Sequence, residues 1–284
     1  MIKLGLIGHL LEHSLSPKIH MAALDSCGLK GEYSLYPIAP EVQERLTDLL
    51  DRVRNGEITG LNVTIPHKQN VMPLLDELTP TAQAIGAVNT IWMQNGKLVG
   101  DNTDAPGFFA ALEKFLTTKA RRSTDTKTAL ILGAGGSARA VVYALVNDGW
   151  TIAIASRRIE KAQALIAELS NPKPRLTGIE YHSDAIHPLL PALSLIVNTT
   201  PLGMFPSIDA SPWPEKLPFP PNAAVYDLVY NPRETKLVLN AHSAGLPATS
   251  GLGMLIEQAA LAFEIWTDCS PPREALWNAL NTEI

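Results

Sequence analysis

A glycine-rich turn stands between an apolar segment and a helical pattern near the middle of the chain. Residues 128–132 predict a buried parallel strand and are followed at once by Gly133-Ala134-Gly135-Gly136-Ser137-Ala138. Gly133 permits a tight turn, and Gly135 lets a pyrophosphate approach the backbone. The next helix offers its unpaired N–H groups to phosphate oxygens. The pattern predicts a dinucleotide site; the alternative is a turn that binds nothing.

The end of the next apolar segment indicates which dinucleotide would bind. Residues 151–155 predict a second strand, which ends at Ser156-Arg157-Arg158. An NAD-binding unit has Asp or Glu at this point to hold the ribose hydroxyls. Arginine instead offers a planar set of donors to a 2′-phosphate. We therefore predict NADP, with a solvated helix start as the alternative for Arg157 and Arg158.

Two hydroxyl side chains near the N-terminus are suited to binding a carboxylate. Ser14 and Ser16 directly precede a helical pattern, so both would lie at a helix N-terminus. A structural account is also sufficient, because Ser16 is a good N-cap and Pro17 suits the first helical position.

Lys68 and Asp104 each follow a predicted strand. Asn62 and Thr64 share one face of the strand predicted at 58–65, and Lys68 stands just beyond it. Open α/β sheets bind ligands at the C-terminal ends of their strands. The alternatives are a solvated helix start for Lys68 and a helix N-cap for Asp104.

The remaining patterns describe alternating strands and helices, which indicate α/β organisation. A hairpin turn is predicted at Asn95-Gly96, and a polar linker at 117–127. Further strands are predicted at 2–8, 32–38, 86–93, 97–100, 193–198 and 223–229. Helices are predicted behind Ser16 and at 42–53, 69–75, 105–116, 158–169, 234–244, 254–266 and 273–280.

Composition sets limits on function. The chain has 284 residues, enough for two domains, and its net charge of −5 gives no basic excess for binding nucleic acid. No apolar run approaches the length of a membrane span, and the N-terminus does not resemble a signal peptide. Two cysteines, Cys27 and Cys269, are too few for a disulfide framework, so we expect them to be free thiols in a reducing cytosol. We expect a cytoplasmic protein with no membrane partner.

Taken in order, the motifs resemble those of the shikimate dehydrogenase family over essentially the whole chain. They are Ser14-Leu-Ser16-Pro17, Asn62-Val-Thr-Ile-Pro-His-Lys68, Gly86-Ala-Val-Asn89-Thr90, Asp101-Asn-Thr103-Asp104, Gly133-Ala-Gly-Gly-Ser137, Asn198-Thr-Thr, Tyr226-Asp-Leu-Val-Tyr230 and Gly251-Leu-Gly-Met254-Leu-Ile-Glu-Gln258.

The resemblance implies reversible reduction of 3-dehydroshikimate to shikimate with NADPH, in aromatic amino-acid biosynthesis. Ser14 and Ser16 would hold the substrate carboxylate, and Lys68 with Asp104 would form the catalytic pair. The ring hydroxyls would be bound by Thr64, Asn89, Asp104, Tyr230 and Gln258. The cofactor would contact Gly133, Ala134, Gly135, Gly136, Ser137, Ser156, Arg157, Arg158, Lys161, Leu228 and Gly251, and no metal is expected.

The resemblance also implies a two-domain α/β fold with a cleft between the domains. The substrate domain would be discontinuous, made of 1–104 and 251–284, and 105–250 would form a Rossmann-like NADP domain. We expect a monomer or a homodimer. Lysine is an ammonium at neutral pH, so Lys68 would polarise the carbonyl and donate a proton in the reducing direction, held by Asp104.

Three positions depart from the family pattern. The first motif lacks the usual proline after Gly8, and we expect a different loop before Ser14 with both serine hydroxyls retained. Pro80 stands where relatives often have an acidic residue near the nicotinamide, so that contact is not carried over. Ser156 replaces a common asparagine.

Two rival functions stay open at this stage. A quinate/shikimate dehydrogenase with broader substrate or cofactor use differs by one ring substituent, and Arg157 and Arg158 argue against its use of NAD. A non-catalytic NADP-sensing module on the same fold would be favoured by loss of Lys68 or Asp104, and both are present.

Overall fold

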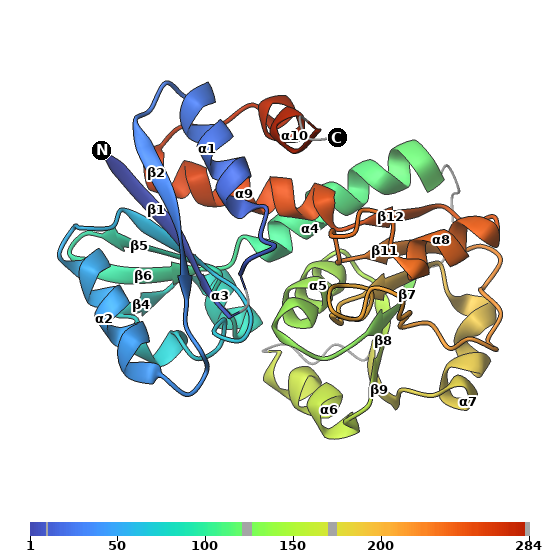
Figure 1. The fold of residues 1–284 in the computed structure, drawn as a ribbon. Helices are drawn as coiled ribbons and strands as arrows, with labels where there is room; N and C mark the ends of the chain where they lie inside the picture. The colour runs from blue at the N-terminus through green and yellow to red at the C-terminus, as the bar shows by residue number, and fades with distance from the viewer. Residues whose placement is uncertain (10, 121–126, 170–174, 282–284) are drawn as a thin grey trace. The chain divides into compact units, whose positions relative to one another are not determined.

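The computed structural model describes residues 1–9, 11–120, 127–169 and 175–281. The chain divides into two compact units (Figure 1). Unit 1 comprises Met1–Gly107 and Ile256–Ile284, and unit 2 comprises Phe108–Leu255. Each unit has a six-stranded sheet with helices packed on it, which confirms the predicted α/β class.

The sheet of unit 1 is mixed. Its order is β2 (Gly31–Pro37), β1 (Ile2–Gly8), β3 (Gly60–Val63), β5 (Thr90–Gln94), β6 (Lys97–Asp101) and β4 (Glu77–Leu78). β1 runs parallel to β2 and β3, whereas β5 is antiparallel to both of its neighbours. The predicted hairpin is confirmed between β5 and β6, where Asn95 and Gly96 both have positive φ.

One face of this sheet is covered by α2 (Gln43–Arg54), whose Leu46, Leu50 and Val53 are buried. The helix predicted at 42–53 begins one residue later than expected, and Val42, which we expected to face inward with these residues, precedes the helix and is exposed. The remaining short helices of this part of the chain are η1 (Met72–Leu74) and α3 (Pro80–Ile85).

A helix predicted over 69–75 is reduced to the single 3₁₀ turn of η1. Pro73 lies in the middle of that segment, and proline has no N–H to continue an α-helix. Residues 69–75 have the apolar spacing of a helix, but the proline prevents the continuous hydrogen bonding that an α-helix requires. The helix α3 was not predicted.

The opposite face of the sheet is covered by α1 (Ser16–Ser26) and by the end of α9 (Leu252–Thr267). Trp266 of α9 packs directly on Gly60 of β3, where any side chain at position 60 would collide with the indole. The Trp266 indole N–H donates to the carbonyl of Ile91 at 3.1 Å. The C-terminal segment therefore contributes side chains to the core of unit 1 that the N-terminal segment forms.

Unit 2 contains an all-parallel sheet. Its order is β12 (Ala248–Ser250), β11 (Ala224–Asp227), β10 (Leu195–Asn198), β7 (Thr128–Leu132), β8 (Thr151–Ser156) and β9 (Leu176–Glu180). This is the order of a doubly wound dinucleotide-binding sheet, with its switch point between β7 and β10. The edge strands β9 and β12 were not predicted, because neither contains a buried apolar run.

Unit 2 contains several helices beside its sheet. They are the later part of α4 (Asp104–Phe115), η2 (Leu116–Ala120), α5 (Gly136–Asn147), α6 (Ile159–Glu168), α7 (Ser183–Ile186), η3 (His187–Ala192) and α8 (Lys236–Ser243). The first residues of the predicted linker at 117–127 continue α4 as a π-helical turn, and 121–126 lie outside the described residues. Within the described ranges, no helix combines the length and the apolar character needed to cross a bilayer.

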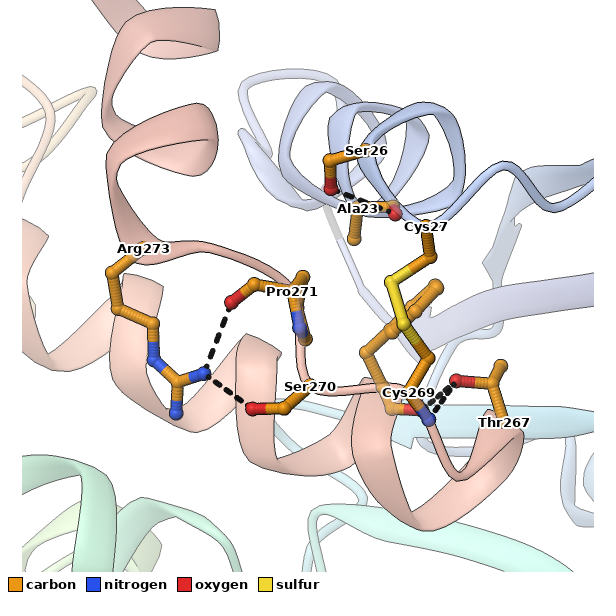
Figure 2. The surroundings of a disulfide bond; sticks show 9 residues. Ala23, Ser26, Cys27, Thr267, Cys269, Ser270, Pro271 and Arg273 are labelled. Carbon is orange, nitrogen blue, oxygen red and sulfur yellow. Dashed lines mark hydrogen bonds between the residues drawn. A yellow bond between two sulfur atoms is a disulfide. The ribbon is translucent and has the colours of Figure 1, made fainter.

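A disulfide joins the N-terminal and C-terminal segments that make up unit 1. Cys27 follows α1, and Cys269 lies before α10 (Arg273–Asn281), with 6.5 Å between their Cα atoms (Figure 2). Helices α1 and α10 lie side by side, as the blue and dark-red helices of Figure 1 show. The expectation that both cysteines are free thiols is therefore wrong. Sequence spacing does not predict this bond, because the cysteines are 242 positions apart and meet only when the C-terminal helices return to α1.

We expect reduction of this disulfide to lower the stability of unit 1. Cross-linking distant residues restricts the unfolded chain, and native disulfides typically contribute about 2–4 kcal/mol. Urea unfolding followed by circular dichroism, with and without reductant, should show the unfolding transition at lower urea in the reduced protein. The Cys27→Ser/Cys269→Ser variant is the control, and reductant should leave its transition unchanged. An equal shift in both proteins would contradict a role for the bond.

Candidate active site

The core of the candidate site is an ion pair in unit 1. Lys68 follows β3 after a tight turn that contains a cis peptide between Ile65 and Pro66. Its Nζ lies 2.5 Å from Oδ2 of Asp104, and the two side chains are only 10% and 6% exposed. The carbonyl of Lys68 accepts from the N–H of Val88 at 2.8 Å, so the backbone at Lys68 is held as well. A lysine and an aspartate are thus placed together, away from most solvent.

Asp104 does not cap its helix. It is the first residue of α4, and the side chain of Asn102 instead accepts from the N–H of Ala105 at 3.2 Å. The N-cap alternative for Asp104 is therefore wrong. Because Asn102 serves the helix end, both oxygens of Asp104 bind other side chains, Lys68 at Oδ2 and Asn89 at Oδ1.

Asn89 connects the ion pair to helix α9, which carries Gln258. Its Nδ2 donates to Asp104 at 2.9 Å and to Oε1 of Gln258 at 3.3 Å. Its Oδ1 accepts from the N–H of Thr103 at 2.8 Å. Asn89 and Gln258 are 169 positions apart, and both are buried. The structure therefore brings four of the predicted residues, Lys68, Asn89, Asp104 and Gln258, into one hydrogen-bonded group.

Among the predicted hydroxyls of unit 1, Ser14 lies on the turn after β1, Ser16 is the first residue of α1, and Thr64 follows β3. Ser14 Oγ accepts from the N–H of Ser16 at 3.3 Å, so these two serines are adjacent. The prediction that Ser16 is an N-cap is wrong. Helix α1 begins at Ser16, so the N-cap position is Leu15, and no side-chain hydrogen bond caps the helix there. Thr64 follows β3, and its N–H donates to the carbonyl of Ile7 at 2.8 Å.

The glycine-rich turn of unit 2 has room for a phosphate. Gly133 has φ +108°, and a Cβ there would lie 2.7 Å from Oγ1 of Thr199, so only glycine fits. A Cβ built on Gly135 would meet no atom within 4 Å. The 12-residue helix α5 begins directly after Gly135 and has no side-chain cap. Open space, a helix N-terminus and the backbone of Ala134, Gly136 and Ser137 together fit a dinucleotide pyrophosphate.

The basic residues predicted to contact the cofactor follow β8. Arg157, Arg158 and Lys161 are exposed, whereas Ser156 is buried and its Oγ accepts from the N–H of Arg158 at 3.3 Å. Arg157 also lies close enough to Tyr181, at the end of β9, for its charge to oppose the rise that burial causes in the pKa of the tyrosine. The exposed arginines fit an anionic group at this edge of the sheet.

Leu228 and Gly251 meet at the ends of β11 and β12. A Cβ on Gly251 would collide with the carbonyl oxygen of Leu228, so this position requires glycine. The N–H of Gly251 donates to the carbonyl of Val229 at 3.1 Å. Tyr230 follows in the same loop and belongs to unit 2.

Three family models match this chain. They are the shikimate dehydrogenase substrate binding domain over residues 6–91, shikimate/quinate 5-dehydrogenase over 116–189 and the shikimate 5′-dehydrogenase C-terminal domain over 251–280. A protein of Methanocaldococcus jannaschii described as shikimate dehydrogenase (NADP(+)) is 42% identical, over 99% of this chain and 96% of the relative.

The chain belongs to the shikimate dehydrogenase family. This confirms the resemblance that the motifs indicate. The crystal structure of the Thermus thermophilus shikimate 5-dehydrogenase in complex with NADP(H) and shikimate has a TM-score of 0.85 and 36% identity, covering all of both chains. The structure of a Corynebacterium glutamicum quinate dehydrogenase with NAD has a TM-score of 0.86 and 32% identity, covering 99% of each chain.

Sequence reasoning missed a buried carboxylate in unit 2 of this family member. Asp227 ends β11 and has no exposed surface. Its Oδ1 accepts from Nδ2 of Asn198 at 2.8 Å and from the N–H of Val229 at 3.0 Å, and its Oδ2 accepts from Oγ1 of Thr235 at 2.5 Å. These bonds fix the loop that carries Leu228 and Tyr230. The available signal was an acidic residue at the end of an apolar strand.

Burial raises the pKa of Asp227 to about 6, against the opposing effect of its three hydrogen bonds. The folded state therefore binds this proton more tightly than the unfolded state, whose carboxyl titrates near 3.8. We expect Asp227 to reduce stability progressively as pH rises from about 4 to 7, by about 3 kcal/mol in total. Urea unfolding of the wild type and Asp227→Asn across this range should show the variant gaining stability relative to the wild type. A difference that stays constant with pH would contradict the assignment.

Proposed function

We propose that this chain is an NADP-dependent shikimate dehydrogenase, which reversibly reduces 3-dehydroshikimate to shikimate in aromatic amino-acid biosynthesis. The observation that carries the proposal is the buried contact between Lys68 and Asp104 in a member of this family. A non-catalytic NADP-sensing module would not need a lysine and an aspartate held together in this way. The shikimate dehydrogenases to which the chain is similar are described as NADP(+) enzymes.

Unit 1 supplies the substrate site in this proposal. The domain would consist of 1–104 and 251–284. Ser14 and Ser16 bind the carboxylate, because adjacent hydroxyls at the start of α1 can donate to both of its oxygens. The ring hydroxyls are bound by Thr64, Asn89, Asp104, Gln258 and, from unit 2, Tyr230.

Residues 105–250, with Gly251 at the boundary, supply the cofactor site. The turn 133–137 holds the pyrophosphate, and the 2′-phosphate is bound by Ser156, Arg157, Arg158 and Lys161. Leu228 and Gly251 also contact the cofactor. We further propose that the protein is cytoplasmic, acts as a monomer or homodimer, and requires neither a metal nor a nucleic acid.

NADPH, when bound, supplies the hydride that reduces the ketone of the substrate. Lys68 supplies the proton, which passes from Nζ to the carbonyl oxygen, so that C=O becomes CH–OH. Asp104 holds the ammonium through Oδ2, while Asn89 holds the other oxygen of the carboxylate. In the oxidising direction the neutral amine of Lys68 accepts the hydroxyl proton. An ammonium is the ordinary form of lysine at neutral pH, which favours the biosynthetic direction.

Replacement of Lys68 by alanine should abolish proton transfer and leave the other substrate contacts in place. We expect kcat to fall by about 10²–10⁴, with little change in KM for shikimate. The assay is NADPH absorbance in both directions, with NADPH affinity measured separately by fluorescence. Lys97→Ala is the control, because Lys97 is exposed and pairs only with Glu77 among the described residues. Retention of most of kcat in Lys68→Ala would refute the assignment.

Replacement of Arg157 by alanine should weaken NADP and spare NAD. The arginine is exposed, so solvent screening reduces a charge-assisted contact, and we expect KM for NADP to rise roughly tenfold. The wild type should prefer NADP in kcat/KM, and the preference should weaken as salt rises. Arg45→Ala on α2 is the control. An equal loss with both cofactors would show that Arg157 does not bind the 2′-phosphate.

Quinate is the alternative substrate, favoured by the similarity to a quinate dehydrogenase structure. Quinate and shikimate share the carboxylate and ring hydroxyls that the proposed site would bind. Turnover of each, measured with NADP and with NAD, separates the two functions. Higher kcat/KM for quinate with NAD would favour the alternative.

A further inference from the structure

A second set of buried polar side chains lies beside the catalytic pair, and the proposed mechanism does not use it. Asn62 on β3 is 5% exposed, and Tyr33 on β2 is 8% exposed. The Tyr33 hydroxyl donates to Oδ1 of Asn62 at 2.8 Å. β2 and β3 are not neighbours, because β1 lies between them, so this bond crosses the whole width of β1.

Asn62 passes the connection to Asn89. Its Nδ2 donates to the carbonyl of Asn89 at 3.2 Å, and the N–H of Val63 donates to the same carbonyl at 2.8 Å. The backbone of Asn89 is therefore held by two donors from β3. The side chain of the same residue donates to Asp104, which holds Lys68. A continuous series of hydrogen bonds thus leads from Tyr33 to the catalytic pair.

The ring of Tyr33 is itself held in place. It stacks on His20 of α1, with 4.4 Å between ring centroids and 3° between the planes. Burial lowers the pKa of His20 to about 3, with a smaller opposing effect of Asn62, so the imidazole is neutral at working pH. His20 contacts Tyr33 through this ring stacking.

Packing alone does not account for Asn62. Asparagine is disfavoured in strands, and a buried amide is costly unless its donors and acceptor are paired. An apolar side chain would fill this face of β3, where Trp266 already packs against Gly60. What an apolar residue could not do is donate to the backbone of Asn89. The hydrogen bond from Asn62 to the Asn89 backbone thus explains why Tyr33 and Asn62 are polar.

We propose that Tyr33 and Asn62 are positioning residues for Lys68 and Asp104, and that they act through Asn89. The inference rests on the proposed function, since it concerns the proton transfer by Lys68. Tyr33 fixes Asn62, Asn62 fixes the Asn89 backbone, and Asn89 orients the carboxylate that holds the ammonium. A small displacement of a reacting group is enough to slow a reaction substantially.

The test is Tyr33→Phe, which removes one hydroxyl and keeps the ring that stacks on His20. We expect kcat to fall about tenfold with KM for shikimate and for NADP nearly unchanged, because only the reacting pair is displaced. Tyr36→Phe is the matched control on the same strand, and its kcat should equal that of the wild type. Asn62→Ala breaks the series one residue closer to Asn89 and should cost at least as much.

A double-mutant cycle separates positioning from a general structural effect. If Tyr33 acts through Lys68, then Tyr33→Phe should have no effect in a Lys68→Ala background. An equal loss of kcat in both backgrounds, or a wild-type kcat in Tyr33→Phe and Asn62→Ala, would overturn the proposal. Failure of the proposed function would be visible independently, as absent turnover of shikimate by the wild type or full activity of Lys68→Ala.

Discussion

The ion pair between Lys68 and Asp104 is the interaction around which unit 1 is arranged. Removing two charges from water is costly, and a buried pair is maintained only when further hydrogen bonds satisfy its remaining atoms. Asn89 serves the second oxygen of Asp104, and Asn102 takes over the helix cap that Asp104 would otherwise provide. The neighbouring polar residues are thus requirements of the pair. A lysine and its paired carboxylate can be held away from water only within such surroundings.

The C-terminal segment supplies the part of these surroundings that the first hundred residues lack. Gln258 bonds to Asn89, and Trp266 covers Gly60 beneath the strand that leads to Lys68. The disulfide between Cys27 and Cys269 ties the same segment to α1. Residues of the proposed substrate site and core residues therefore come from both ends of the chain, and the hydrogen-bonded group around Lys68 is complete only when the C-terminal helices are in place.

In unit 2, buried polar contacts hold several loops at the end of a parallel sheet. Asp227 binds Asn198, Val229 and Thr235, and so connects the loops that follow β10 and β11. Gly133 and Gly251 allow backbones to approach where any side chain would collide. Hydrogen bonds to the Asp227 carboxylate and close backbone approaches at the two glycines hold these loops in place. Arg157, by contrast, is exposed.

The sequence by itself determined the family, the α/β class, the strand of the glycine-rich turn and the candidate catalytic residues, because these depend on local periodicity and on short motifs. The sequence left a helix-cap role open for Ser16 and Asp104, since both residue types are good N-caps, and only the structure shows that neither residue serves as one. It also overlooked Tyr33, Asp227 and the pairing of Cys27 with Cys269. Each of these depends on a partner from another element, and in the disulfide the partner is 242 positions away. Such contacts leave no periodic signal in the chain, because they arise only when separate strands and helices pack against one another.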